Sequence, residues 1–469
     1  MSERRDSAAA APNGDAAGLP ARRMALLFTV MLIIAAGNTA MQSVMPSIGA
    51  RLGIADVWVS LAYSWSALLW MLLAPFWARR SDRLGRKAMM SLGLAGFSLS
   101  FGLCGAALLA GLKGVVGGLT AILLFATARS LYGTFGSAAP PAVQAYVASR
   151  TSRAERTRAL SLIASSFGLG TALGPALAPL LIVPGVGLIG PFIAFTLGAL
   201  GVLAILRLRL PDDAPQVGEV DSHAPEHESA TPTAARTAIA PPFRVQGRAR
   251  AFGEYADGWP DRTDLADDDD PGFTGRLRWG DPRIRHWLVA GALGGQAQSI
   301  LLGVIGFLLL DRLGLRHQPD AAAGPIGLVL MCGAIAMLLA QWGLIPMLSL
   351  GPRMSTMLGM GLVAVGALPV ALGNDLHAIA TGFAICSVGF GLFRPGFTSG
   401  TSLAVSLGEQ GQAAGIVTAV NGSAYIISPA IGVWLYNHSH WMVWALVEAL
   451  VLSVLVLFLR DRRAEIRVH

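Results

Sequence analysis

Long apolar segments recur along the whole chain, and they restrict its fold more than any other feature. A membrane-spanning helix needs about 20 mostly apolar residues, because the hydrocarbon core is about 30 Å thick and a helix rises about 1.5 Å per residue. The runs show no two-residue alternation, so a membrane β-barrel is excluded. The sequence therefore predicts an all-α membrane protein with twelve transmembrane helices, at residues 24–46, 57–78, 88–110, 116–146, 159–182, 187–207, 286–310, 324–348, 354–373, 376–404, 411–436 and 441–459.

Basic residues flank these runs unevenly, and this bias predicts the orientation of the chain. With the N-terminus inside, the inside flanks hold 24 Lys and Arg residues, whereas the outside flanks hold only Arg51, Lys113, Arg312 and Arg316. Lys and Arg are retained on the cytoplasmic side, so both termini are expected in the cytoplasm. The Ala-, Gly- and Arg-rich composition suggests a bacterial source, and the expected location is then the inner membrane. The same bias accounts for the net charge of +7 without a nucleic-acid partner.

The termini and the cysteines indicate neither targeting nor a metal site. The first 23 residues are polar and no cleavable signal peptide is evident, because the first apolar run is long enough to be a span. The three cysteines fall inside predicted helices, too far apart in the sequence for a metal site or an obvious disulfide. No metal or other cofactor is expected.

A polar stretch separates six spans from six. Residues 211–283 are rich in Pro, Ser, Ala and acidic residues, which predicts a mostly disordered cytoplasmic linker. The alternative, a metal or partner site at His223, His227 and Asp267–Asp270, is left open. The predicted order is an N-terminal tail (1–23), a six-helix half (24–210), the linker (211–283), a second six-helix half (284–460) and a C-terminal tail (461–469).

The two halves share a short internal repeat. An offset of 254 residues pairs Pro141 with Pro395, Gly168 with Gly422, and Pro175 with Pro429. Parallel repeats of this kind are related by an axis along the membrane normal, and the substrate site lies between them near mid-depth. The repeat therefore predicts two pseudo-symmetric halves with a central cavity.

Three local patterns carry a resemblance to a known family. They are Asp82-Arg-Leu-Gly-Arg-Lys87 in the turn between the second and third spans, Arg129-x-x-x-Gly133-x-x-Gly136 in the fourth, and Gly170-x-x-x-Gly174-Pro175 in the fifth. Together with the twelve spans they resemble the major facilitator superfamily, and within it the twelve-span drug:proton antiporter branch. This resemblance implies alternating access and proton-coupled efflux of small amphipathic compounds or metabolites by a monomer.

The first pattern has a physical reading as a conformational latch. Gly85 allows a tight reversal, and Arg83, Arg86 and Lys87 meet anionic headgroups. A purely topogenic loop would explain these cations but not Asp82. In the family picture this acid caps the N-terminus of the eleventh span, near Gly411, when the cavity faces outward.

The other two patterns concern the membrane interior. A cation such as Arg129 within a span usually faces a water-filled cavity, and the resemblance assigns it to proton coupling or substrate attraction. The alternative is an Arg satisfied by backbone carbonyls. Gly170, Gly174 and Pro175 form a small-residue face that allows close helix packing. The resemblance interprets this face as a seal against proton leak.

The chain departs from the family pattern in its acids. Ser149 stands where the family places an acid that would pair with Arg86, and Glu448 in the last span is the only acid away from the span ends. A proton carrier is normally a buried carboxylate, so Glu448 is the candidate. Two intramembrane cations, Arg129 and Arg394, suit an anionic substrate. Further cavity candidates are Asn38, Gln42, Trp65, Gln296, Gln298, Gln341 and Asn421.

Three functions remain open from the sequence. The first is a proton-coupled exporter, the second an organic-anion carrier that uses the two arginines, and the third a transport-inactive membrane sensor. An enzyme is not expected, since no nucleophile–base pair, metal cluster or phosphate-binding loop of the G-x-x-x-x-G-K-[ST] type is present.

Overall fold

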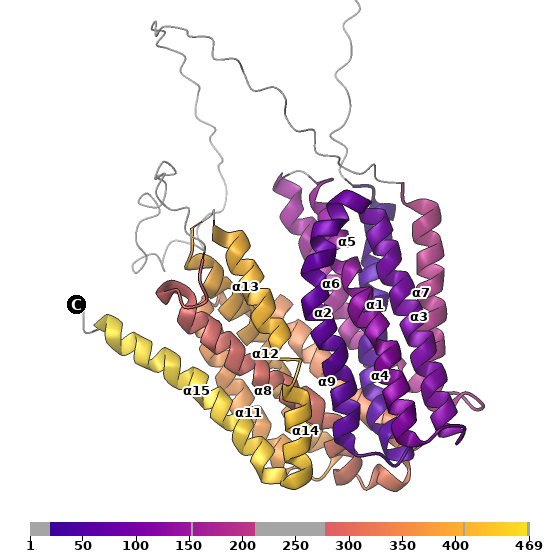
Figure 1. The fold of residues 1–469 in the computed structure, drawn as a ribbon. Helices are drawn as coiled ribbons and strands as arrows, with labels where there is room; N and C mark the ends of the chain where they lie inside the picture. The colour runs from indigo at the N-terminus through magenta and orange to yellow at the C-terminus, as the bar shows by residue number, and fades with distance from the viewer. Residues whose placement is uncertain (1–18, 152, 212–276, 407–408, 467–469) are drawn as a thin grey trace, which may run out of the picture. The chain divides into compact units, whose positions relative to one another are not determined.

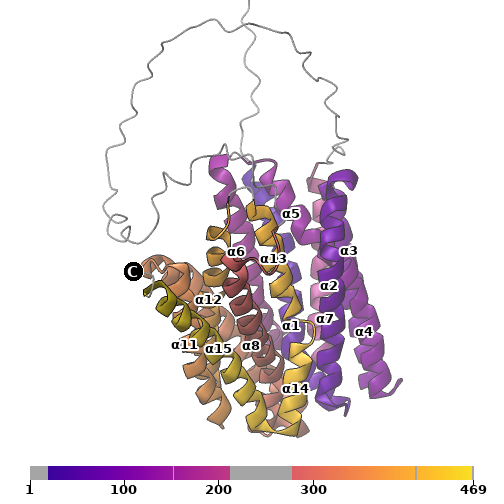
Figure 2. The same cartoon turned by 60° about the vertical axis from the view of Figure 1, so that its left-hand side comes forward.

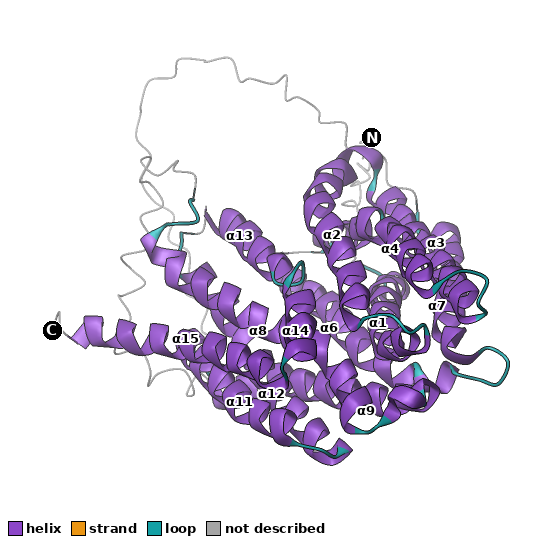
Figure 3. Ribbon diagram, turned by 60° about the horizontal axis from the view of Figure 1, so that its bottom comes forward, coloured by secondary structure: helices purple, strands orange, loops and turns teal. Residues whose placement is uncertain are grey.

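The computed structural model describes residues 19–151, 153–211, 277–406 and 409–466. These residues are helical or in turns, and no strand occurs among them (Figure 3). The helices belong to one compact unit, formed by residues 1–216 together with 278–469. The predicted linker lies almost entirely outside the described residues, as do His223, His227 and Asp267–Asp270.

The first half consists of seven α-helices that pack against one another (Figure 1). They are α1 (Ala21–Arg51), α2 (Asp56–Leu84), α3 (Arg86–Leu112), α4 (Gly118–Thr134), α5 (Ala139–Ala148), α6 (Arg153–Leu177) and α7 (Gly190–Arg209). Short 3₁₀ turns accompany them at η1 (Gly136–Ala138), η2 (Pro179–Leu181) and η3 (Gly187–Ile189).

The second half repeats this pattern with eight α-helices (Figure 2). They are α8 (Pro282–Arg312), α9 (Pro319–Leu339), α10 (Ile345–Leu348), α11 (Pro352–Leu372), α12 (Leu376–Leu403), α13 (Gln410–Ser423), α14 (Ser428–His438) and α15 (His440–Ile466). A 3₁₀ turn, η5 (Leu315–His317), precedes α9, and a π-helical turn, η6 (Ala340–Leu344), joins α9 to α10.

Ten of the described helices are long and apolar enough to cross a membrane. The predicted fourth and fifth spans are not among them, because α4 has only 17 residues and the apolar part of α6 is a shorter helix, Leu162–Leu177. Each predicted span nevertheless coincides with one helix or with consecutive helices. The structure is therefore compatible with twelve crossings, and its all-α architecture agrees with the prediction.

Prolines explain where the predicted spans are broken. Pro140 and Pro141 stand in the first turn of α5, and Pro429 stands in the first turn of α14. Proline has no backbone N–H to donate, so it is tolerated at the start of a helix but interrupts one that continues through it. The breaks after α4 and α13 follow from this rule.

The helical unit has two faces, one at each end of its helices. The face where α1 begins and α2 turns into α3 is called the predicted cytoplasmic face. The face where α1 ends and α2 begins is called the opposite face. By the order of the helices, α8 and α13 begin at the predicted cytoplasmic face, whereas α9 and α12 begin at the opposite face.

Candidate functional site

Arg129 lies on α4, against α1 and α2. Its side chain is only 3% exposed. Nη2 donates to Asn38 Oδ1 at 2.7 Å, and Nη1 lies 3.6 Å from Met41 Sδ. The guanidinium carbon is 4.8 Å from the ring centroid of Tyr63 and 4.9 Å from that of Tyr132. Cation–π contacts of this kind contribute about 2 kcal/mol when desolvated. A neutral amide and two aromatic rings therefore surround the charge, and none of the ion pairs among the described residues includes it.

The glycine face of α6 packs directly on α1. A Cβ atom at Gly174 would lie 2.2 Å from both Ala36 O and Thr39 Oγ1, and one at Gly170 would lie 2.6 Å from Leu32 O. Thr39 Oγ1 also lies 3.4 Å from Gly170 O, at the long end of a hydrogen bond. In the structure this face of α6 lies close to α1, a partner that the sequence did not identify.

The second half has a similar contact, in which the acceptor lies at the expected offset. Ser299 Oγ on α8 donates to Ala424 O at 2.8 Å. Ala424 is the repeat partner of Gly170, because the two differ by the same 254 residues that pair Gly168 with Gly422. One hydroxyl-to-carbonyl contact thus joins corresponding helices in each half.

Another pair of repeat positions, Gly168 and Gly422, contacts the other half. A Cβ atom at Gly168 on α6 would lie 2.9 Å from Leu338 on α9, and one at Gly422 on α13 would lie 3.5 Å from Met71 on α2. In addition, a Cβ atom at Gly327 on α9 would meet the carbonyl of Pro175 at 2.7 Å. The boundary between the halves therefore includes the pairs α6–α9 and α2–α13, related as the repeat predicts, together with contacts of α1 with α9 and of α2 with α14.

The turn between α2 and α3 has the geometry expected of its glycine. Gly85 adopts a φ of 87° immediately before α3, a conformation that side chains rarely take. Arg86 donates to Ser149 Oγ at the end of α5, so the serine that replaces the expected acid still accepts from this arginine. Lys87 is half-buried in the first turn of α3. The side chains of Asp82 and Arg83 lie outside the described residues, and the latch stays a prediction.

On the opposite face an ion bridge joins the two halves, and sequence reasoning missed it. Arg316 on η5 donates to the Asp56 carboxylate on α2 at 2.7 and 3.2 Å. Arg316 also pairs with Asp311 at the end of α8, and the Tyr436 hydroxyl donates to Asp311 at 2.9 Å. Asp56 is only 3% exposed. The carboxylates of Asp311 and Asp56 hold the pKa of Arg316 above its ordinary range.

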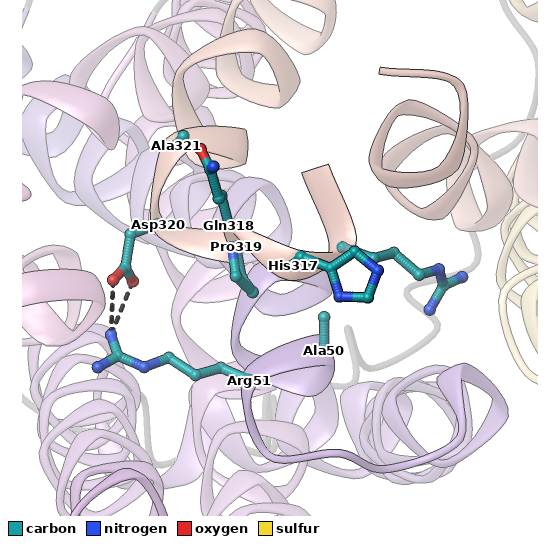
Figure 4. A pocket seen from close by; sticks show the side chains of 8 residues that line it. Ala50, Arg51, His317, Gln318, Pro319, Asp320 and Ala321 are labelled. Atoms are coloured by element: carbon teal, nitrogen blue, oxygen red, sulfur yellow. Dashed lines mark hydrogen bonds and ion pairs between the residues drawn. The ribbon is translucent and has the colours of Figure 1, made fainter. Parts of the chain in front are cut away.

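A second, more exposed bridge lies on the same face. Arg51 Nη1 is 2.8 Å from both carboxylate oxygens of Asp320, with the side chains 46% and 58% exposed. Figure 4 shows this pair at one side of an open pocket and His317 at the other. The lining residues are Ala50, Arg51, Arg316, His317, Gln318, Pro319, Asp320 and Ala321. The sequence signal that could have found both bridges is the scarcity of charge in the predicted outside turns.

The predicted cytoplasmic face carries a separate ion cluster within the second half. Arg283 on α8 binds Glu409 through two bonds, of 2.9 and 3.0 Å, and Asp281 at 2.9 Å. Glu409 also accepts from the amide and hydroxyl of Ser406, and it is 5% exposed. These bonds lower the pKa of Glu409 to about 2. The cluster fastens the start of α8 to the segment that leads into α13.

The remaining candidates do not gather into one described contact network. Arg394 on α12 is half-buried, and no described hydrogen bond or ion pair involves it. Glu448 Oε1 on α15 is buried without a hydrogen-bond partner. Trp65 is 48% exposed, and its Nε1 donates to Ser130 Oγ at 2.7 Å. Asn38 alone among the polar cavity candidates bonds to Arg129. The others, which have no described side-chain hydrogen bond, are Gln42, Gln296, Gln298, Gln341 and Asn421.

The fold and these contacts define a class of protein: a multi-pass membrane protein with two repeated helical halves that meet along paired helices. A family model described as Major Facilitator Superfamily matches residues 27–407. The chain therefore belongs to the major facilitator superfamily. This family agrees with the sequence prediction of a transporter and not an enzyme.

Two multidrug resistance proteins are similar to this chain over part of their length. Multidrug resistance protein 2 of Bacillus subtilis (strain 168) is 33% identical over 132 residues, which are 28% of this chain and 30% of that protein. Multidrug resistance protein 1 of the same strain is 30% identical over 200 residues, 42% of this chain and 48% of that protein. The matched segments span less than half of each relative.

Solved structures support the fold. A bacterial homologue of the human lysosomal transporter Spinster, in an inward-facing and occupied conformation, is similar with a TM-score of 0.65 and 11% sequence identity. The alignment covers 94% of this chain and 96% of that one. At this identity the likeness concerns the fold alone.

Proposed function

We propose that this protein is a secondary transporter of a bacterial inner membrane that exports small amphipathic compounds by alternating access, in exchange for protons. Both of its termini are then cytoplasmic, and the opposite face is the outer one. The partial matches to multidrug resistance proteins support export. The absence of a phosphate-binding loop in the sequence favours an ion gradient over ATP as the energy source.

The observation that carries the proposal is the bridge between Arg316 and Asp56. It joins the halves at the opposite face, where both described ion pairs between them lie. Alternating access requires that such links break and re-form as the cavity changes sides. The Asp56 carboxylate is buried, so removal of Arg316 would leave an uncompensated charge and disfavour this state. We infer that the structure represents the state closed to the outside.

Glu448 is the proposed proton carrier. Its Oε1 atom is buried on α15 without a donor, and an ionisable group inside a membrane is expected to be functional. The helix packs against α8, α11 and α14, all within the second half. Protonation there would act on the second half rather than on Arg129.

Inside-out vesicles that hold a proton gradient test this function. A pH-sensitive dye reports the gradient while neutral, anionic and cationic amphipathic compounds are added. We expect compound-dependent collapse of the gradient in the wild type and in Glu448→Asp, and its loss in Glu448→Gln. Substrate flux that leaves the gradient unchanged, or full coupling in Glu448→Gln, would contradict proton exchange through this residue.

A further inference from the structure

Two buried hydrogen-bond donors beside each other lack acceptors. They are the Nε–H of Arg129 and the hydroxyl of Tyr63, and both atoms are buried without a partner. The guanidinium carbon lies 4.8 Å from the Tyr63 ring centroid, so the two groups belong to one small region. Buried donors are almost always paired, and each exception calls for an explanation.

The charge of the same region is also unbalanced. Arg129 contacts the neutral oxygen of Asn38, the thioether of Met41, and the rings of Tyr63 and Tyr132. None of these carries a negative charge, and no described ion pair includes Arg129. A buried charge is normally paired, because transfer of an isolated ion out of water is very unfavourable. The region therefore contains one positive charge without a counter-charge and two hydrogen-bond donors without acceptors.

The location suits a transported compound. Arg129 is held between α1 and α2, and these helices also border the second half: α1 contacts α8 and α9, whereas α2 contacts α13 and α14. Transporters of this architecture bind substrate at the interface between repeats. Tyr63 thus lies on α2, which borders the second half, and the Arg129 side chain reaches it from α4.

We propose that Arg129 Nε–H and Tyr63 O–H form a subsite for a single carboxylate or sulfonate, so that the preferred substrates are amphipathic monoanions. This inference rests on the proposed transport function and specifies its substrate class. One unpaired cation matches one negative charge, and ionised acceptors form the stronger hydrogen bonds. The rings of Tyr63 and Tyr132 supply apolar surface for the rest of the compound. A cationic compound would be repelled by the same guanidinium.

Matched acid and amide pairs test the subsite on the full-length protein in lipid nanodiscs. The probes are 2-naphthoate with 2-naphthamide, 4-phenylbutyrate with 4-phenylbutyramide, and decanoate with decanamide, measured by isothermal titration. We expect at least one acid to bind about tenfold more tightly than its amide. Tyr63→Phe should reduce that preference, and Arg129→Gln should abolish it. Equal binding, or no binding, of acid and amide in all three pairs would overturn the proposal.

Lys113→Gln is the control. It removes an exposed cation in the turn between α3 and α4 that has no described contact with Tyr63, so the acid preference should persist. Loss of the preference in this variant as fully as in Arg129→Gln would show a general positive potential instead of a subsite, and would overturn the proposal. If Arg129→Gln does not fold, the proposal is tested by the acid preference of the wild type and by its reduction in Tyr63→Phe.

The transport measurement separates this inference from the proposed function. Acids that bind preferentially but are not moved across vesicles would support the subsite and refute the transport proposal. Acids and amides that bind equally and are both exported would refute the subsite and leave the transport proposal intact.

Discussion

Gly174 illustrates how a single missing side chain sets the distance between two membrane helices. The positions 2.2 Å from its missing Cβ are a backbone carbonyl, Ala36 O, and the hydroxyl of Thr39. Backbone cannot move aside as the end of a flexible side chain can. The α1–α6 contact therefore depends on glycine at this position.

Gly174→Ala should destabilise the protein by about 1–3 kcal/mol, the usual range for overpacking a well-packed interior. Thermal unfolding of the purified protein measures the loss. Gly201→Ala on α7 is the control, since a Cβ there would meet nothing within 4 Å. An equal loss of thermal stability in the two variants would mean that α1 and α6 do not pack as closely as described.

Ser149 shows what residue-level reasoning can and cannot give. The family pattern correctly directed attention to the position opposite Arg86, and the two side chains do form a hydrogen bond. The pattern also singled out Arg129, but its neighbours Tyr63 and Met41 belong to other helices. Side chains brought together by helix packing leave no spacing signal in the sequence.

At the scale of elements, apolar length predicted the helices well but not their interruptions. Apolar runs cannot show whether a helix continues through Pro141 or restarts there, because both alternatives are equally apolar. The π-helical turn η6, which contains Gln341, has no signal in hydropathy at all. Such turns are often found at functional sites.

The cluster around Glu409 predicts a pH dependence at the junction of α8 and α13. Its pKa is lowered from an ordinary value of 4.5 to about 2, first by Arg283 and then by bonds from Ser406. A lowered pKa means that the stabilisation is present above the unfolded value and is lost as the pH falls through the folded one. The contribution should be complete near pH 6 and should decline between pH 4.5 and 2.

Glu409→Gln tests this dependence. Its melting temperature should lie below that of the wild type at pH 6, and the difference should narrow as the pH approaches 3. A difference that stays constant over this range would show that the charge of Glu409 does not hold the junction.

At the scale of the whole molecule, the repeat was the most informative sequence feature. The offset of 254 residues predicted which positions correspond, and Gly168 and Gly422 both lie at the boundary between halves. The ion bridges were not predictable in the same way. Asp56 on α2 and Arg316 on η5 are 260 residues apart, and no spacing in the sequence marks them as partners.

The two bridges should differ in strength. Asp56 is buried, so loss of its partner leaves an uncompensated charge and typically costs about 3–5 kcal/mol. Arg51 and Asp320 are exposed, and such pairs contribute about 0–1 kcal/mol. Arg316→Ala should therefore favour opening on the opposite face much more than Arg51→Ala does.

The most direct test of alternating access is a distance measurement across the opposite face. Spin labels can be attached at Val115 in the α3–α4 turn and at His377 on α12, both exposed, after Cys104, Cys332 and Cys386 are replaced by serine. Double electron–electron resonance in nanodiscs should show one short distance in the wild type. A second, longer distance should become dominant in Arg316→Ala and stay minor in Arg51→Ala. An unchanged single distance in Arg316→Ala would contradict the inference that this bridge closes the transporter to the outside.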